Sequence, residues 1–223
     1  LSDKVQNVRF TTMNKKLKCI AIADTHGMYK DLEIPDGDIL IHAGDITRHG
    51  KLSELNDFND WLGEQPHKHK IIIAGNHDWC FERQKETSIK ILTNAIYLED
   101  QSIEIEGHKF YGSPWQPWFM NWAFNLQRGE EIQEKWDLIS NDVDVLITHG
   151  PAFGILDKIY SGEKTGCENL LTKIEEIKPK IHICGHIHEG YGRVVCHGIE
   201  FINASVTNER YKPTNDPISF TVE

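Results

Sequence analysis

The 223-residue chain lacks long apolar runs and an excess of basic residues. No apolar run approaches the roughly 20 residues that a transmembrane helix needs, so the sequence predicts no membrane partner. The 24 Lys and Arg stand against 34 Asp and Glu, a formal net charge of −10, which argues against extended nucleic acid as a ligand because phosphate backbones select a basic face. The first residues also lack an apolar signal region, so we expect a cytoplasmic location.

Two kinds of motif are missing as well. The five cysteines are scattered and show no Cys-x-x-Cys spacing, which gives no sign of a disulfide framework or a thiolate zinc site. The glycine-rich phosphate loops of kinases and dehydrogenases are absent from the sequence. Histidine, in contrast, is abundant, with twelve residues. The chemistry of this chain must therefore be sought among its histidines and carboxylates.

Five short β-rich runs alternate with helical patterns from residue 18 onward. Each run is nearly continuous in apolar residues, which is typical of strands covered on both faces. The predicted strands are 19–23, 39–43, 70–74, 144–148 and 180–184. The predicted helices are 52–62 (with Ser53 as N-cap), 130–139 and 167–178.

Hairpins are predicted over 103–112 and 192–204, where Xaa-Gly turns divide two β-rich runs, and a last strand is predicted over 218–222. Strands that alternate with helices indicate βαβ units and a mainly parallel sheet, to which the hairpins add antiparallel strands. The predicted fold class is therefore α/β, with two sheets packed together and helices outside. We expect a single domain over residues 17–223, preceded by an N-terminal extension over residues 1–16.

Polar side chains follow all five apolar strands at their carboxyl ends. The five segments are Asp24-Thr25-His26, Gly44-Asp45, Gly75-Asn76-His77-Asp78, His149-Gly150 and Gly185-His186-Ile187-His188. Ligands bind at this edge of open α/β sheets, and glycine permits the close backbone approach that a crowded site needs. The sequence therefore predicts one converging cluster.

The donors in this cluster are carboxylate and amide oxygens and imidazole nitrogens. They belong to Asp24, His26, Asp45, Asn76, His149, His186 and His188. Such a set suits manganese, iron or zinc and is too rich in histidine for calcium or magnesium alone. Seven ligands exceed the needs of one ion, whereas two ions that share Asp45 would use them all. Paired ions clamp the oxygens of a phosphoryl displacement and acidify a bridging water.

Two polar residues of the third segment, His77 and Asp78, are left over from this ligand set. Asp78 could orient His77 as an acid or electrophile. His42 and His182 lie inside strands, and we expect them to be buried imidazoles bonded to the backbone.

Aromatic residues crowd the loop between 113 and 128. Aromatic faces can stack on a nucleobase, and we expect Trp115 and Trp118 to contact the substrate, with Asn121 as a polar companion. The alternative is that these aromatics form the core of their own loop.

The motifs Asp-x-His, Gly-Asp, Gly-Asn-His-Asp, His-Gly and Gly-His-x-His, in this order, resemble those of the calcineurin-like metallophosphoesterase superfamily. The similarity is closer to the branch of metallophosphoesterase-domain-containing (brain-type) proteins. It extends to FNDWLG (58–63), PWQPWF (114–119), THGP (148–151) and INAS (202–205), and it covers nearly the whole chain from about residue 17.

The resemblance implies a four-layer αββα sandwich that binds two divalent ions. One ion would take Asp24, His26, Asp45 and His188, and the other would take Asp45, Asn76, His149 and His186. His77 would meet the leaving group, with Asp78 in support.

The implied activity is hydrolysis of small phosphodiesters, cyclic nucleotides in particular, by attack of a metal-bridging hydroxide, with manganese the expected ion and iron or zinc the alternatives. Two other functions stay open: a phosphomonoesterase or nuclease of the same superfamily, and a mononucleotide-binding regulator with little turnover. Some members of the branch carry glycine in place of His186, so the histidine of this chain favours catalysis.

Overall fold

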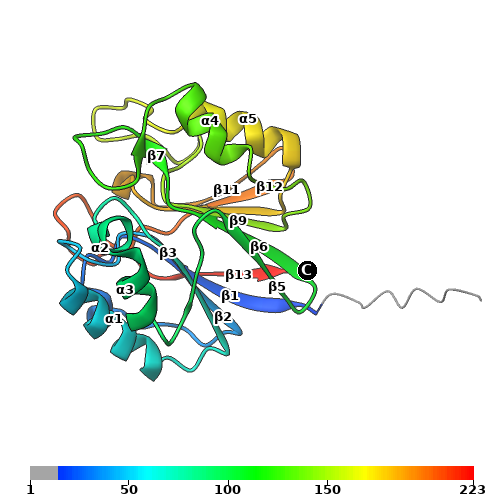
Figure 1. Ribbon diagram of the computed structural model, residues 1–223. Helices are drawn as coiled ribbons and strands as arrows, with labels where there is room; N and C mark the ends of the chain where they lie inside the picture. Colours follow the sequence, from blue (N-terminus) through cyan, green and yellow to red (C-terminus); the bar gives the residue numbers. More distant parts are fainter. Residues whose placement is uncertain (1–14) are drawn as a thin grey trace, which may run out of the picture.

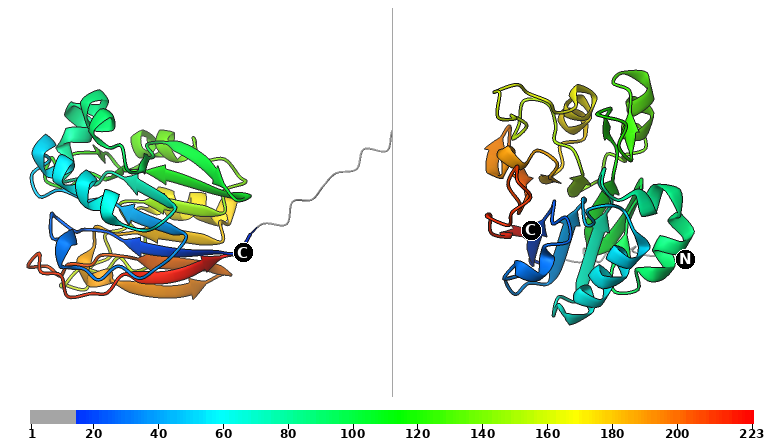
Figure 2. Two further views of the ribbon diagram at one scale, coloured as in Figure 1. Left: turned by 90° about the horizontal axis from the view of Figure 1, so that it is seen from below. Right: turned by 90° about the vertical axis from the view of Figure 1, so that its left-hand side faces the viewer.

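The computed structural model describes residues 15–223, so the N-terminal extension expected over residues 1–16 lies almost entirely outside the described residues. Two β-sheets pack face to face, and helices cover the outer face of each sheet (Figures 1 and 2). This arrangement confirms the four-layer αββα sandwich.

The first sheet has five strands in the order β13-β1-β2-β3-β4. They are β1 (Leu17–Ile22), β2 (Ile39–Ala43), β3 (His69–Ile73), β4 (Ile96–Tyr97) and β13 (Ile218–Val222). β1 to β4 run parallel to one another, and β13 pairs antiparallel with β1. The strands expected at 19–23, 39–43, 70–74 and 218–222 are all present in this sheet.

The second sheet has six strands in the order β11-β12-β10-β9-β6-β5. They are β5 (Gln101–Ile105), β6 (His108–Ser113), β9 (Val145–Thr148), β10 (Ile181–Cys184), β11 (Gly192–Cys196) and β12 (Ile199–Asn203). The two edge strands belong to the predicted hairpins, which turn at Glu106-Gly107 and His197-Gly198. All four turn residues have φ between 52° and 86°, the conformation of two-residue hairpin turns.

The core lies mainly between the two sheets. Alternate residues of β1 show why its inner part is apolar: Cys19 and Ala21 pack against the second sheet, whereas Ile20 and Ile22 pack under the helices. β9 divides its side chains in the same way, with Val145 in the central layer. A strand that is buried on both faces leaves little room for a charged side chain until it ends.

Helices cover each sheet from outside. On the first sheet these are α1 (Leu52–Glu64), α2 (Trp79–Arg83) and α3 (Lys85–Ile91); on the second they are α4 (Glu130–Trp136) and α5 (Glu168–Ile177). The prediction that Ser53 caps α1 was wrong. The N-cap position is Lys51, two residues earlier, and the Glu54 carboxylate accepts hydrogen bonds from the Arg48, His49 and Lys51 amides at 3.0–3.2 Å.

The loop expected to bear substrate contacts is framed by a short ladder. β7 (Gln116–Pro117) and β8 (Asn125–Leu126) pair parallel, and residues 118–124 project between them. Two single-turn 3-10 helices, Tyr29–Asp31 and His188–Gly190, follow β1 and β10. Within residues 15–223, we find no helix with the length and hydrophobicity required to cross a membrane.

Candidate metal centre

The carboxyl ends of β1, β2, β3, β9 and β10 meet at one edge of the sandwich and bring the predicted ligands together. Three overlapping groups of donor atoms each lie within 4.8 Å of one another: Asp24, His26 and His188; His26, Asp45 and His77; and Asp24, Asp45 and His149. These residues come from both sheets, so the centre forms only when the two sheets are packed. The structure therefore builds a compact donor cluster from residues as distant in sequence as Asp24 and His188.

Asp45 lies at the middle of this cluster. Its Oδ1 is 3.4 Å from His149 Nε2, and its Oδ2 is 3.8 Å from His26 Nε2 and 4.0 Å from His77 Nε2. Asp24 occupies one side, with its Oδ1 3.7 Å from His188 Nε2. One carboxylate thus has imidazoles on both sides, which is the placement a shared ligand requires.

Asn76 and His186 complete the set on the far side of Asp45. The Asn76 Oδ1 lies 2.9 Å from His149 Nε2, and the rings of His149 and His186 have centroids 5.0 Å apart. The His186 amide donates to the Asp24 carboxylate at 2.9 Å, which ties this loop to the opposite sheet. The structure therefore brings all seven predicted ligands into one centre.

Backbone carbonyls set the orientation of two imidazoles that belong to the predicted ligands. His149 Nδ1 donates to the Ala43 carbonyl at 3.0 Å, and His188 Nδ1 donates to the Asn208 carbonyl at 2.9 Å. A carbonyl can only accept, so Nδ1 carries a hydrogen and Nε2 is the atom that faces the cluster. This outer contact is typical of metal-ligating histidines, whose second nitrogen is usually fixed in the same way.

Opposite charges shift the pKa values of these imidazoles. Burial would lower the pKa of His149, but the Asp45 carboxylate outweighs it and raises that pKa to about 9. Burial opposes the same shift in His188, whose pKa the Asp24 carboxylate raises to about 9. For His26, burial dominates and lowers the pKa to about 4. Without ions, the centre therefore balances two carboxylates with two protonated imidazoles at neutral pH.

The backbone around the centre is strained and tightly packed. Four of the seven predicted ligands have a left-handed φ between 44° and 68°: Asp24, His26, Asp45 and His186. Non-glycine residues in this region cost roughly 1 kcal/mol or more and cluster at functional sites. A Cβ at Gly75 would overlap Asp45, and one at Gly185 would overlap Asp24. Buried carboxylates, inward-facing Nε2 atoms and this close backbone cradle all fit a bound divalent metal.

His77 and Asp78 lie at the same edge but do not form the expected pair. The Asp78 carboxylate accepts from the Ile46 and Thr47 amides and from Gly75 at 2.9–3.1 Å. His77 Nδ1 instead donates to the Arg48 carbonyl at 3.0 Å. The expectation that Asp78 orients the His77 ring was therefore wrong in its geometry: Asp78 ties the β2 and β3 loops together.

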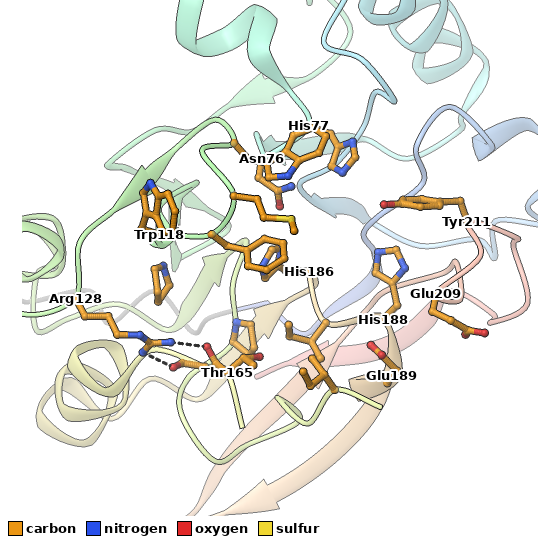
Figure 3. Close-up of a pocket in the computed structure, with 18 residues that line it drawn as sticks. Asn76, His77, Trp118, Arg128, Thr165, His186, His188, Glu189, Glu209 and Tyr211 are labelled. Carbon is orange, nitrogen blue, oxygen red and sulfur yellow. Dashed lines mark hydrogen bonds between the residues drawn. The ribbon is translucent and has the colours of Figure 1, made fainter. Parts of the chain in front are cut away.

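A pocket of about 570 Å³ opens beside the centre (Figure 3). Its walls include Asn76, His77, His186 and His188 from the centre and the aromatic loop between β7 and β8. Of the three residues expected to contact substrate, Trp118 lines the pocket. Trp115 turns away because its Nε1 donates to Asp100 at 2.9 Å. Asn121 is exposed to solvent and is not among the described residues that line the pocket.

Sequence reasoning missed two aromatic residues at the centre. Trp122 stacks on His77, and Tyr211 packs its ring edge-to-face against His26 at 4.7 Å between centroids. Trp122 lies in the aromatic cluster that the sequence did indicate. Tyr211 lies in an irregular loop before β13 at φ 57°, and an isolated tyrosine there carries no sequence signal.

The two strand histidines support the centre from behind. His42 and His182 are buried, as expected, but within the described residues 15–223 they bond to side chains and not to the backbone. His42 Nε2 lies 2.9 Å from Thr25 Oγ1, and His182 Nε2 lies 2.8 Å from Thr148 Oγ1. Each threonine is adjacent in sequence to a predicted ligand, so each pair fixes the end of a strand that bears ligands.

Comparison with known proteins agrees with the fold. A model of the calcineurin-like phosphoesterase family matches residues 17–190. Metallophosphoesterase domain-containing protein 1 of Homo sapiens is 42% identical over 224 residues, which cover 89% of this chain and 69% of that protein. A UPF0046 protein of Caenorhabditis elegans is 40% identical over 220 residues, which cover 92% and 75%.

A solved structure is similar in fold as well. The protein TT1561 of Thermus thermophilus superposes with a TM-score of 0.60 at 12% identity, over 94% of this chain and 100% of that one. The family model spans the β1 to β10 strand ends that build the centre, and both relatives align over most of the chain. This chain is therefore a member of the calcineurin-like phosphoesterase family, whose phosphoester hydrolases normally bind divalent metals.

Proposed function

We propose that this protein is a dinuclear metal-dependent phosphodiesterase that acts on small phosphodiesters, with cyclic nucleotides as the favoured class. The observation that carries the proposal is the placement of Asp45, whose two carboxylate oxygens face different imidazoles, those of His149 and His26. A single carboxylate with donors on both sides is suited to bridge two ions.

The residues divide into two ligand sets about Asp45. One ion would be held by Asp24, His26, Asp45 and His188, and the other by Asp45, Asn76, His149 and His186. Manganese, iron and zinc all suit these oxygen and imidazole donors, and manganese is our first choice. When bound, the two ions supply Lewis-acid polarisation of the phosphoryl group and an acidified water as nucleophile.

The side chain of His77 would act on the leaving group. Its Nδ1 is committed to the Arg48 carbonyl, so in the doubly protonated ring the second proton sits on Nε2. His77 also lines the pocket beside Asn76 (Figure 3), so this proton is available to the departing oxygen. Asp78 contributes indirectly, by holding the Gly75 and Thr47 amides and with them the loop that bears His77.

The pocket supports a monoanionic diester over a dianionic monoester. Its volume of about 570 Å³ suits a nucleotide-sized ligand, and much of its wall is apolar. Its lining includes the acidic Glu189 and Glu209, and the Arg128 guanidinium is already bound to the Gly166 and Thr165 carbonyls at 2.8 Å. The described pocket wall outside the centre therefore offers little unpaired positive charge to balance the second negative charge of a phosphate monoester.

The first test compares a diester with its matching monoester. Purified protein, with and without added manganese, is given bis-p-nitrophenyl phosphate, p-nitrophenyl phosphate and cyclic nucleotides. We expect manganese-dependent turnover with kcat/KM at least about tenfold higher for the diester. Preference for the monoester would favour a phosphomonoesterase. Two bound ions without turnover of any ester would favour the mononucleotide-binding regulator.

Metal binding is expected to release about two imidazole protons per chain at pH 7, in addition to the proton of the water that the ions acidify. The pKa values of His149 and His188 are both raised to about 9, so at pH 7 each Nε2 carries a proton that must leave before it can ligate. The imidazole share of the proton count falls toward zero as the pH rises through 9, and apparent affinity for Mn²⁺ rises over the same range.

Calorimetric titration of Mn²⁺ in two buffers of different ionisation enthalpy measures this count. A His197→Gln variant is a suitable control, because His197 is an exposed hairpin residue outside the centre, and it should release the same number of protons. Binding without proton release at pH 7 would contradict the paired charges inferred for the ion-free centre.

A further inference from the structure

The indole of Trp122 lies flat against the imidazole of His77. The two ring centroids are 4.3 Å apart, and the ring planes differ by 25°. On another side, the His26 ring meets His77 edge-to-face, with centroids 4.5 Å apart. The His77 ring is therefore held between a stacked indole and a ligand imidazole, an arrangement that restricts rotation about its side-chain bonds.

The backbone of Trp122 is fixed to the loop that carries His77. The amide of the next residue, Ala123, donates to the Asn76 carbonyl at 3.2 Å. The following amide, that of Phe124, donates to the Glu82 carboxylate at 2.8 Å. The two residues that follow Trp122 are therefore hydrogen-bonded to the segment that bears Asn76 and His77. A shift of the aromatic loop would move the indole and the imidazole together.

The other contacts of the His77 ring are more distant or involve a single atom. The Tyr211 ring meets it edge-on with centroids 6.0 Å apart. Within residues 15–223, its hydrogen bond is the one to the Arg48 carbonyl at 3.0 Å, and the nearest carboxylate oxygen, Asp45 Oδ2, is 4.0 Å from Nε2. A single hydrogen bond fixes one ring atom but leaves the ring free to swing about it. The orientation of the plane, and with it the direction of Nε2, must come from packing.

We propose that Trp122 is a positioning residue for His77: its stacked indole holds the imidazole plane so that Nε2 points at the leaving oxygen of the phosphodiester. The inference rests on the proposed function. A displacement of about 1 Å in a catalytic group can cost roughly 100-fold in rate, so loss of the indole should lower kcat through His77 while leaving the metal ligands in place.

The dependence of the rate on the leaving group distinguishes this positioning role of Trp122 from a merely structural one. An aryl diester with a good leaving group, such as dinitrophenolate, needs no proton from His77, whereas an alkyl diester needs one. We expect Trp122→Ala to lower kcat about 100-fold on the alkyl diester and less than about threefold on the dinitrophenyl diester. Trp122→Phe, which keeps a flat ring against His77, should recover most of the lost rate.

Three further measurements sharpen the test. The double variant Trp122→Ala/His77→Ala should be no slower than His77→Ala alone, because both changes remove the same proton transfer.

In the ion-free protein, the nuclear magnetic resonance signals of the His77 ring protons should move downfield when the stacked indole is removed. Trp115→Ala is the matched control: its indole also belongs to this segment and is half-buried, but it bonds to Asp100 and should not change the leaving-group dependence.

Equal losses on both diesters, or additive effects in the double variant, would overturn the role of Trp122 and leave the proposed function intact. Absence of turnover by the manganese-loaded wild type on every ester would instead overturn the proposed function, and the role of Trp122 with it.

Discussion

Replacing Asp45 with asparagine is expected to reduce manganese-dependent hydrolysis of a phosphodiester by about 10³-fold or more in kcat/KM, which corresponds to roughly 4 kcal/mol of transition-state stabilisation. Asparagine has nearly the same volume and keeps one oxygen for the His77 amide, which donates to Asp45 Oδ1 at 2.8 Å. The change therefore removes one negative charge and one of two ligand oxygens from the middle of the centre while preserving its packing.

The metal content should fall further in this variant than in variants of residues that would bind only one of the two ions. Asp45 would serve both ions, whereas Asp24 and His186 would each serve one. We expect elemental analysis of dialysed protein to find about two ions in the wild type, one after Asp24→Asn or His186→Ala, and less than one after Asp45→Asn. An Asp45→Asn protein that keeps two ions would show that this carboxylate does not bridge.

A matched control is Asp142→Asn. The Asp142 side chain is 72% exposed and pairs with Lys109 Nζ at 2.7 Å, so the same chemical change is made at the surface. Exposed ion pairs contribute roughly 0–1 kcal/mol, and both the activity and the metal content should stay at the wild-type level. Circular dichroism of each variant confirms that the fold is retained.

The convergence of the candidate metal ligands could be predicted from the sequence because it depends on a general property of parallel strands. The inner parts of β1, β2, β3, β9 and β10 are covered on both faces and are apolar apart from the buried His42 and His182, so the other polar residues lie at or near the strand ends. The carboxyl ends of parallel strands lie at one edge of a sheet. The position of each motif at a strand end was therefore enough to predict that distant residues such as Asp24 and His149 lie together.

The roles of Asp78 and Trp115 could not be predicted, because side-chain partners are set by tertiary contacts. Asp78 follows His77 in sequence, yet its carboxylate satisfies the Thr47 amide and hydroxyl at 2.9 and 2.8 Å. The partner of His77 is a backbone carbonyl, which any residue type supplies and no pattern reveals. Trp115 likewise turns from the pocket because Asp100, 15 residues earlier, accepts its indole hydrogen.

The sequence also could not predict that the two hairpins lie in the same sheet. Their turns are encoded locally by Glu106-Gly107 and His197-Gly198, which adopt positive φ. Their places at opposite edges of the second sheet, however, depend on which strands lie beside β9 and β10, and that choice is made by long-range packing. Local turn chemistry predicts a hairpin but not its neighbours.

Substitution of Gly75 by alanine is expected to lower kcat/KM by about 100-fold or more and to destabilise the fold by roughly 1–3 kcal/mol. A Cβ at this position would lie 2.6 Å from His149 Cε1 and would also overlap the amide and carboxylate of Asp45. The Gly75 amide donates to Asp78 at 2.9 Å, so the loop cannot move away without breaking the link between β2 and β3. The strain must therefore fall on the ligands themselves.

Gly63→Ala provides the comparison for this substitution. Gly63 lies in α1, where alanine favours the helix, and its Cβ would meet only the exposed side-chain amide of Asn94, at 3.0 Å from the Nδ2 that donates to the Asn59 carbonyl. We expect wild-type activity and a free energy of unfolding within about 1 kcal/mol of the wild type. Chemical denaturation and diester hydrolysis measure both variants. If Gly75→Ala behaved like Gly63→Ala, the close approach of the β3 loop to Asp45 would not be what holds the ligands in place.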